Sequence, residues 1–180
     1  MLVLGDSISA AYGIQREQGW VHLLQERLAD IDPIYLVVNA SISGETTGGG
    51  LARLPAVLES HDPAVVIIEL GGNDGLRGYP VARIRSNLEQ LVATANPDSR
   101  EILLVGMQIP PNYGPRYTRS FQGLFEDVSA EYGVPLVPSF LEAVVLQPEL
   151  MQRDGIHPKA EAQALLLDTL WPYVWELLEQ

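Results

Sequence analysis

Short apolar runs alternate along the chain with segments in which apolar residues recur every three or four positions. The apolar runs lie at residues 1–4, 35–39, 65–70, 102–107 and 136–138. Unbroken apolar runs of this length are typical of strands that are covered on both faces. Their alternation with helices therefore predicts an α/β fold, in which a parallel sheet lies between two layers of helices.

The helical pattern is clearest at residues 20–28, 51–58, 84–95, 116–132 and 160–178. Pro172 lies inside the last of these segments, where we expect it to kink the helix or to begin a new turn. The sequence contains no internal repeat, low-complexity tract or linker. At a length of 180 residues, it is expected to form a single domain over residues 1–180.

Composition narrows the classes of function. The formal net charge is −12, from 11 basic and 23 acidic residues, which disfavours binding to nucleic acid or to an anionic membrane surface. No apolar run reaches the roughly 18–20 residues that span a bilayer, so we expect no stable membrane insertion. The absence of cysteine excludes disulfides, a thiol nucleophile and Cys-ligated zinc. No signal peptide precedes the first predicted strand, so we expect either a protein made without a leader or one whose leader has been removed.

Four polar blocks stand where the pattern places the ends of strands or the starts of helices. They lie at residues 5–9, 41–46, 71–74 and 154–158. The first three blocks directly follow predicted strands, as does the segment at 108–113. Because ligands of open α/β sheets bind outside the carboxyl ends of the strands, we expect these segments at one rim of the sheet.

Ser7 is the candidate nucleophile. A serine between a strand and a helix is most often an N-cap, and from the residue alone that alternative stays open. The same position would place the hydroxyl at the rim, with the free N–H groups of a helix N-terminus beside a developing oxyanion.

A serine nucleophile needs a base, and the chain has three histidines. His22 lies in an amphipathic helix and His61 at a helix end away from the rim, so we expect both on the surface. His157 precedes the last helix, and Asp154 stands three residues before it. A tight turn through Gly155 would fold that carboxylate onto Nδ1 of the imidazole and set its tautomer.

Gly44 and Asn73 are the candidate oxyanion donors, together with the backbone of Ser7. Asn73 lies in a Gly-Gly-Asn-Asp loop, where asparagine is most often a turn former; in the functional interpretation its side-chain amide binds the oxyanion. The backbone N–H groups of Ser7 and Gly44 would complete the oxyanion hole. Glycine at position 44 would allow a backbone approach that a Cβ would block.

These residues resemble the SGNH hydrolase family, also called the GDSL family. Its four motifs carry Ser, Gly, Asn and His in this order, with an Asp three residues before the His, and this chain matches them one by one at Ser7, Gly44, Asn73, Asp154 and His157. Longer matches at residues 38–44, 50–55, 69–78 and 112–114 are similar to the branch of multifunctional thioesterases, lysophospholipases and arylesterases. The α/β-hydrolase pattern G-x-S-x-G fits Ser7 poorly by comparison.

The resemblance implies a flavodoxin-like three-layer fold whose five parallel strands lie in the order 2-1-3-4-5. It also implies a serine hydrolase that cleaves acyl esters and thioesters through an acyl-Ser7 intermediate and needs no cofactor. No metal site is expected either, because the three histidines are scattered. We expect a monomer that acts on a small acyl ester or thioester. Relatives are usually exported, which implies a periplasmic or secreted protein, although a cytoplasmic one stays open.

Apolar residues in two rim loops are expected to contact the acyl chain of the substrate. The substrate-binding candidates are Leu76, Tyr79, Ile109, Pro110 and Tyr113. Their alternative role is simple packing of the loops over the rim. Among enzymes, the alternative function is a carbohydrate O-deacetylase, whose sugar sites usually carry more aromatic platforms and polar groups. A non-catalytic binding module or a flavin carrier would have no use for the five matched site residues.

Overall fold

A computed structural model describes residues 1–31, 33–96 and 100–179 of the chain. Its sheet contains the strands β1 (Leu2–Gly5), β2 (Val38–Asn39), β3 (Val65–Glu69), β4 (Glu101–Val105) and β5 (Leu136–Val137). All neighbouring strands are parallel, in the order β2-β1-β3-β4-β5. The predicted fold class and strand order are therefore confirmed.

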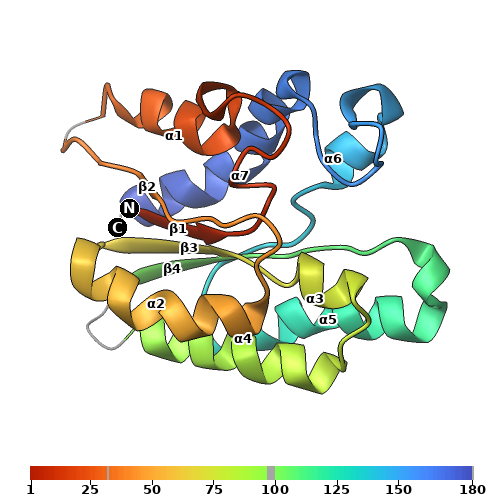
Figure 1. Cartoon of the computed structure of the whole chain (residues 1–180). Helices are drawn as coiled ribbons and strands as arrows, with labels where there is room; N and C mark the ends of the chain where they lie inside the picture. Colours follow the sequence, from red (N-terminus) through yellow and green to blue (C-terminus); the bar gives the residue numbers. More distant parts are fainter. Residues whose placement is uncertain (32, 97–99, 180) are drawn as a thin grey trace.

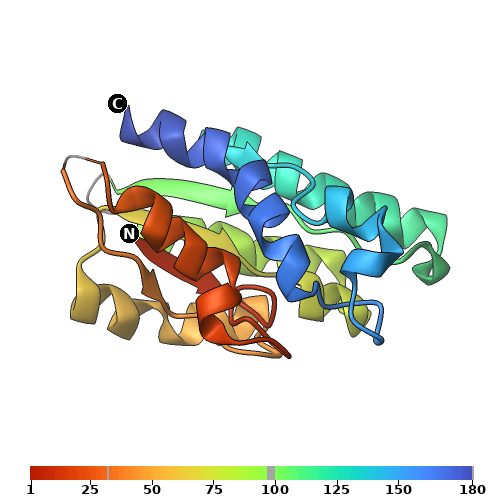
Figure 2. The same cartoon turned by 90° about the horizontal axis from the view of Figure 1, so that it is seen from above.

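Helices cover both faces of the sheet (Figure 1). On one face lie α1 (Trp20–Leu28) and α7 (Gln163–Leu178), and on the other lie α2 (Thr47–His61), α4 (Val81–Ala95) and α5 (Pro115–Tyr132). Seen from above, α1 and α7 cross the sheet next to each other (Figure 2). The shorter helices are α3 (Gly72–Leu76), α6 (Glu142–Val145), η1 (Arg16–Gln18), η2 (Pro111–Tyr113), η3 (Pro148–Leu150) and η4 (Ala160–Ala162).

The two central strands explain the unbroken apolar runs of the sequence. Every residue of β1 and of β3 is buried, because helices cover both faces of the sheet. Burying one such aliphatic side chain stabilises the fold by roughly 1.5–3 kcal/mol. No helix in the described ranges is long and apolar enough to cross a bilayer.

The second strand is shorter than predicted. The apolar run at residues 35–39 forms a strand only at Val38–Asn39. Upstream of it, the side chain of Gln25 donates to the carbonyl of Tyr35 at 3.1 Å and accepts the N–H of Val37 at 2.7 Å. The amide side chain thus satisfies backbone groups that another strand could have paired with. This edge of the sheet is therefore protected against the addition of a further strand.

Two local predictions about helices were wrong. No helix follows Ser7 directly, because residues 7–14 form a series of turns and α1 begins only at Trp20. Asn73 lies on the short helix α3 rather than in a loop. At the other end of the chain, Pro172 lies inside α7, which continues to Leu178.

Candidate active site

Ser7 follows β1 in the middle of the sheet, at the carboxyl end of the strand. The turn after it is closed by two backbone hydrogen bonds, from Ala10 N–H to the carbonyl of Asp6 and from Tyr12 N–H to the carbonyl of Ser7, each at 3.0 Å. Ser7 is buried, with 7% of its surface exposed. Its own N–H donates to no other residue in the described ranges, so the free donor comes from a turn and not from a helix N-terminus.

The loop before η4 holds Asp154 and His157 together. An antiparallel bridge between Met151 and Pro158 closes the loop. At its tip Gly155 has a φ of 68° and donates its N–H to the carbonyl of Gln152 at 3.0 Å. Glycine adopts this left-handed conformation without strain, and the tight turn predicted from the Asp-Gly pair is therefore present.

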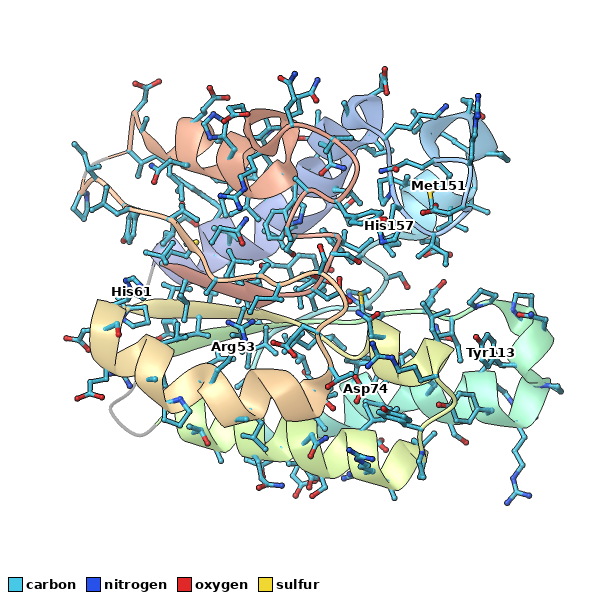
Figure 3. All side chains as sticks on the ribbon, viewed as in Figure 1. Arg53, His61, Asp74, Tyr113, Met151 and His157 are labelled. Atoms are coloured by element: carbon cyan, nitrogen blue, oxygen red, sulfur yellow. The ribbon has the colours of Figure 1, made fainter. Side chains whose placement is uncertain are left out.

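A continuous chain of hydrogen bonds joins Ser7, His157 and Asp154. Nε2 of His157 lies 2.8 Å from Oγ of Ser7, and Nδ1 lies 2.6 Å from Oδ2 of Asp154. The hydrogen bond from His157 lowers the pKa of Asp154 to about 2. The structure thus brings these three predicted residues together, whereas His61 lies at the opposite end of the sheet (Figure 3).

Two further residues hold the His157 loop against the Ser7 turn. The ring centroid of Tyr12 lies 4.5 Å from that of His157. The side-chain amide of Gln152 donates to the carbonyl of Tyr12 at 2.8 Å, while its backbone N–H donates to the carbonyl of His157, also at 2.8 Å. Neither residue was predicted, because an aromatic and a glutamine in loops carry no distinguishing pattern.

The predicted oxyanion donors lie on the segments beside Ser7. Nδ2 of Asn73 donates one hydrogen to Oδ2 of Asp6 at 2.9 Å, which leaves its second hydrogen for a ligand. The carbonyl of Gly44 accepts a hydrogen bond from Nη2 of Arg77 at 3.1 Å, and the N–H of Gly44 donates to no described residue. These contacts leave donors free on both segments.

The backbone conformation at position 44 favours glycine. Within the protein, a Cβ there would meet nothing closer than Nη2 of Arg77 at 3.9 Å, so contacts with other residues do not exclude a side chain. Gly44 has a φ of 81°, a conformation that residues with a Cβ adopt at a cost of about 1–2 kcal/mol.

Two acidic side chains lie directly behind Ser7, and sequence analysis did not single them out. Oδ1 of Asp6 accepts the N–H of Ile8 at 3.0 Å, in addition to the bond from Asn73. Glu69 accepts hydrogen bonds from the N–H of Asp6 at 3.2 Å and from the hydroxyl of Ser9 at 2.5 Å. Burial raises the pKa of Asp6 to about 6. Burial, followed by the charge of Asp6, raises the pKa of Glu69 well above its usual range.

A cavity of about 480 Å³ opens beside Ser7 and His157. Apolar side chains from five segments make up most of its wall: Ile8, Leu76, Met107, Ile109, Pro110, Pro111, Leu141, Val145, Met151 and Ile156. Leu76, Ile109 and Pro110 were predicted to bind substrate. The contributions of Leu141 and of α6 were not predicted.

Two of the predicted substrate-binding residues do not line this cavity. The hydroxyl of Tyr113 donates to the carbonyl of Leu76 at 2.7 Å, on the outer side of the loop. Tyr79 packs against the core, and the guanidinium of Arg83 lies 4.8 Å from its ring centroid. Tyr113 thus bonds the backbone of a wall residue and Tyr79 packs against the core, so both have the packing role that the sequence left open.

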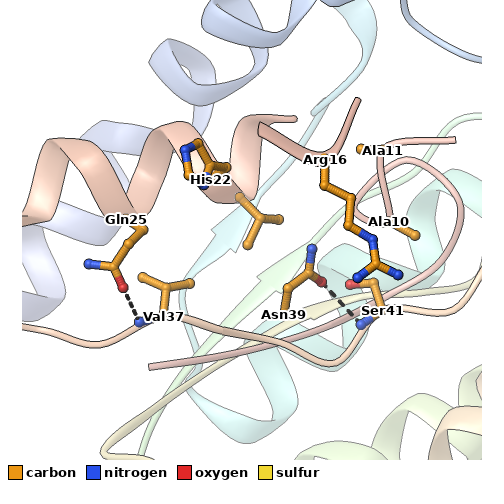
Figure 4. A pocket seen from close by; sticks show the side chains of 9 residues that line it. Ala10, Ala11, Arg16, His22, Gln25, Val37, Asn39 and Ser41 are labelled. Atoms are coloured by element: carbon orange, nitrogen blue, oxygen red, sulfur yellow. Dashed lines mark hydrogen bonds between the residues drawn. The ribbon is translucent and has the colours of Figure 1, made fainter. Parts of the chain in front are cut away.

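A second cavity, of about 250 Å³, lies between α1 and the edge strand β2 (Figure 4). Arg16 and His22 are among its lining residues, and Ser7 and His157 are not. Two hydrogen bonds join its lining residues: Oε1 of Gln25 accepts the N–H of Val37 at 2.7 Å, and Oδ1 of Asn39 accepts the N–H of Ser41 at 3.1 Å. Elsewhere in the described ranges, no group of three or more His, Asp or Glu side chains is arranged to hold a metal ion.

Comparison with known proteins places the chain in a family. Residues 3–165 match the GDSL-like Lipase/Acylhydrolase family. The chain is 53% identical to the esterase TesA of Pseudomonas aeruginosa, over 99% of this chain and 89% of that protein. It is 44% identical to the thioesterase 1/protease 1/lysophospholipase L1 of Escherichia coli K12, over 93% of this chain and 79% of that protein.

A solved structure gives the same result. The psychrotrophic esterase EstA from Pseudoalteromonas sp., inhibited by monoethylphosphonate, has a TM-score of 0.94 and 43% identity, covering 99% of this chain and 98% of that one. Together with the fold, these similarities define an ester hydrolase. The chain belongs to the GDSL-like lipase/acylhydrolase family, and the resemblance predicted from its motifs is confirmed.

Proposed function

We propose that this ester hydrolase cleaves acyl esters and thioesters through a covalent acyl-Ser7 intermediate. The observation that carries the proposal is the chain of hydrogen bonds from Ser7 Oγ to His157 Nε2, at 2.8 Å, and from His157 Nδ1 to Asp154 Oδ2, at 2.6 Å. A nucleophile, a base and an orienting carboxylate in this arrangement are what acyl transfer to a serine requires.

In the first half of the reaction, Oγ of Ser7 attacks the acyl carbon while its proton passes to Nε2 of His157. The tetrahedral intermediate then collapses, and the imidazolium gives that proton to the leaving alcohol or thiol. In the second half, water attacks the acyl-Ser7 ester, and His157 again takes and returns a proton. Asp154 remains ionised throughout and stabilises the imidazolium, consistent with the lowering of its pKa to about 2.

The negative charge of the tetrahedral intermediate needs donors in fixed positions. We assign this role to the N–H groups of Ser7 and Gly44 and to the second Nδ2 hydrogen of Asn73. All three are unused by the described part of the protein. Donors that are held ready for the oxyanion stabilise the transition state more than the ground state, and each contributes roughly 10²–10³ in rate.

The large apolar cavity favours an acyl chain as the bound part of the substrate. Leu76, Ile109, Val145 and Met151 line it together with Ser7. A carbohydrate O-acetyl group would fill little of this space and would meet few polar partners there. The relatives named esterase and thioesterase/lysophospholipase are consistent with an acyl ester or thioester. We also propose export to the periplasm or medium, by family resemblance, to be tested by fractionation of cells that make the native protein.

Covalent labelling tests the proposal. A fluorophosphonate probe, followed by peptide mass spectrometry, should modify Ser7 and should fail to label Ser7→Ala. The same variant should lose roughly 10⁴–10⁶ in kcat. Ser43→Ala is the matched control, since Ser43 is exposed on the Gly44 segment and should leave labelling intact. Labelling at Ser9 or Ser43 in place of Ser7 would refute the assignment.

A further inference from the structure

Glu69 is a buried acid behind Ser7 that the acyl-transfer steps do not use. It is the last residue of β3 and pairs with Gly5 across the sheet. Its carboxyl group points toward the Ser7 turn, where Oε2 accepts the hydroxyl of Ser9 and the N–H of Asp6. A Cβ on Gly5 would lie 2.6 Å from Oε2, so the glycine before the Asp6-Ser7 pair makes room for this acid.

The surroundings of Glu69 favour its neutral form. Glu69 is 0% exposed, and Oε1 has no hydrogen-bond partner among the described residues. The charged group that faces it is the carboxyl of Asp6, from the end of β1, and Asp6 in turn faces His157. A carboxylate that is buried without a cation and beside a second carboxylate is strongly disfavoured, so the acid retains its proton.

Glu69 is linked to the proposed oxyanion donor through Asp6. The N–H of Asp6 donates to Oε2 of Glu69 at 3.2 Å. This hydrogen bond positions the backbone that leads into Ser7. The carboxylate of Asp6 then holds the side chain of Asn73 at 2.9 Å. Two acids thus stand in series behind Ser7, and charges on both at once would repel each other in this buried site. Asp6 makes the contact with Asn73, so it is the acid whose charge serves the proposed donor.

We propose, on the basis of the function assigned above to Ser7 and Asn73, that Glu69 is a positioning residue that must be protonated for catalysis. As a neutral acid it holds Asp6 and Ser9 behind the nucleophile and leaves Asp6 as the only carboxylate that orients Asn73. When Glu69 loses its proton, a second negative charge lies behind the tetrahedral intermediate. Formation of the oxyanion then becomes slower, while binding of the uncharged acyl chain is unaffected.

The pH dependence of kcat separates this role from a purely structural one. Both kcat and KM are measured over a range of concentrations of a p-nitrophenyl ester, with correction for uncatalysed hydrolysis. The pH runs from neutral to the alkaline limit of folding. Glu69→Gln keeps the size and an acceptor oxygen but cannot ionise. The wild-type enzyme should lose kcat at alkaline pH with little change in KM. Glu69→Gln should stay within roughly threefold of the wild type at neutral pH and should lack the alkaline loss.

Two further variants complete the test. Glu101→Gln is the matched control, because Glu101 begins β4 at the other end of the sheet, and it should keep the wild-type profile. Glu69→Ala removes the acceptor and should lower kcat by roughly 10–100-fold without raising KM. If Glu69→Ala does not fold, the pH profile of Glu69→Gln still shows whether ionisation of Glu69 lowers kcat.

Either of two results would overturn the proposal: a loss of kcat in Glu69→Gln at neutral pH as large as in Glu69→Ala, or profiles of Glu69→Gln and wild type that coincide at alkaline pH. Fluorophosphonate labelling in the same samples keeps the two proposals apart. A wild-type enzyme without label on Ser7 would reject the acyl-Ser7 mechanism, whatever the pH profiles show.

Discussion

Asp154 binds His157 at two points. Its Oδ1 accepts the backbone N–H of His157 at 3.1 Å, and its Oδ2 lies 2.6 Å from Nδ1 of the ring. The first contact shapes the turn, and the second orients the imidazole toward Ser7. One side chain thus makes both contacts, so a carboxylate and an imidazole only three residues apart can serve as the proposed orienting group and base.

Asp154→Asn should separate these two tasks. The amide oxygen can still accept the backbone N–H, so the turn should form, but the side chain no longer stabilises the imidazolium and allows the wrong tautomer. We expect kcat to fall by about 10⁴, with an unchanged thermal unfolding midpoint. Arg153→Gln, at the neighbouring exposed position, is the control and should keep full activity. A loss of less than tenfold in Asp154→Asn would mean that the charge of Asp154 is not needed.

Asn73→Ala should lower kcat by roughly 10²–10³ and change KM little, because the oxyanion exists only after attack. The matched control is Asn87→Ala on α4, whose amide donates to Thr47 at 2.9 Å outside the catalytic cavity. Steady-state kinetics with one ester suffices. If Asn73→Ala raises KM and keeps kcat, the residue anchors the substrate and does not serve as an oxyanion donor.

Acyl-chain preference should depend on the apolar wall of the large cavity. Each buried CH₂ contributes up to about 0.8 kcal/mol, so kcat/KM should rise with chain length until the cavity is full. Ile109→Asn, in the wall, should flatten this rise and spare acetate esters. Tyr113→Phe is the control, since its hydroxyl bonds the backbone outside the cavity. The measurement is kcat/KM for esters with acyl chains of two to about sixteen carbons. If wild type and Ile109→Asn give profiles of the same shape, the acyl chain does not bind in this cavity.

Stability should fall as the pH rises above about 4. Burial raises the pKa of Asp6 from its ordinary value of 3.8 to about 6, so between these values the native state binds more protons than the unfolded state. This rise in the pKa of Asp6 corresponds to at most about 3 kcal/mol in the free energy of unfolding. That stabilisation is lost as the pH rises through about 6. Glu69, whose pKa is also raised, extends the loss to higher pH. In urea titrations, Glu69→Gln should therefore gain stability relative to wild type as the pH increases; a constant difference would contradict a proton on Glu69.

The core of the site could be predicted because parallel strands bring their carboxyl ends to one rim. Ser7, Gly44 and Asn73 each follow a different strand, so their proximity is a consequence of topology alone. Asp154 and His157 follow from the geometry of a tight turn. None of these inferences needs the details of side-chain packing, which is why a single sequence was sufficient.

The remaining parts of the site depend on contacts between segments far apart in the chain. Glu69 is the one charged residue of the apolar run at 65–70, but only its pairing with Gly5 brings it behind Ser7. Val145 enters the cavity wall because the segment after β5 folds back over the rim as α6. Tyr12 reaches His157 through a bond to Gln152, 140 positions later. Contacts of this kind have no periodicity or local motif in the sequence.

Ser7 and its base are separated by 150 positions, with a consequence for synthesis on the ribosome. A nascent chain that has emerged as far as α5 already contains the proposed nucleophile and oxyanion donors but has no His157. If Ser7 and His157 act as proposed, hydrolysis cannot begin until the chain has been translated beyond His157 and this residue has folded against Ser7. Translating the chain to different lengths and assaying each ribosome-bound product would show activity switching on only after residue 157 has left the exit tunnel.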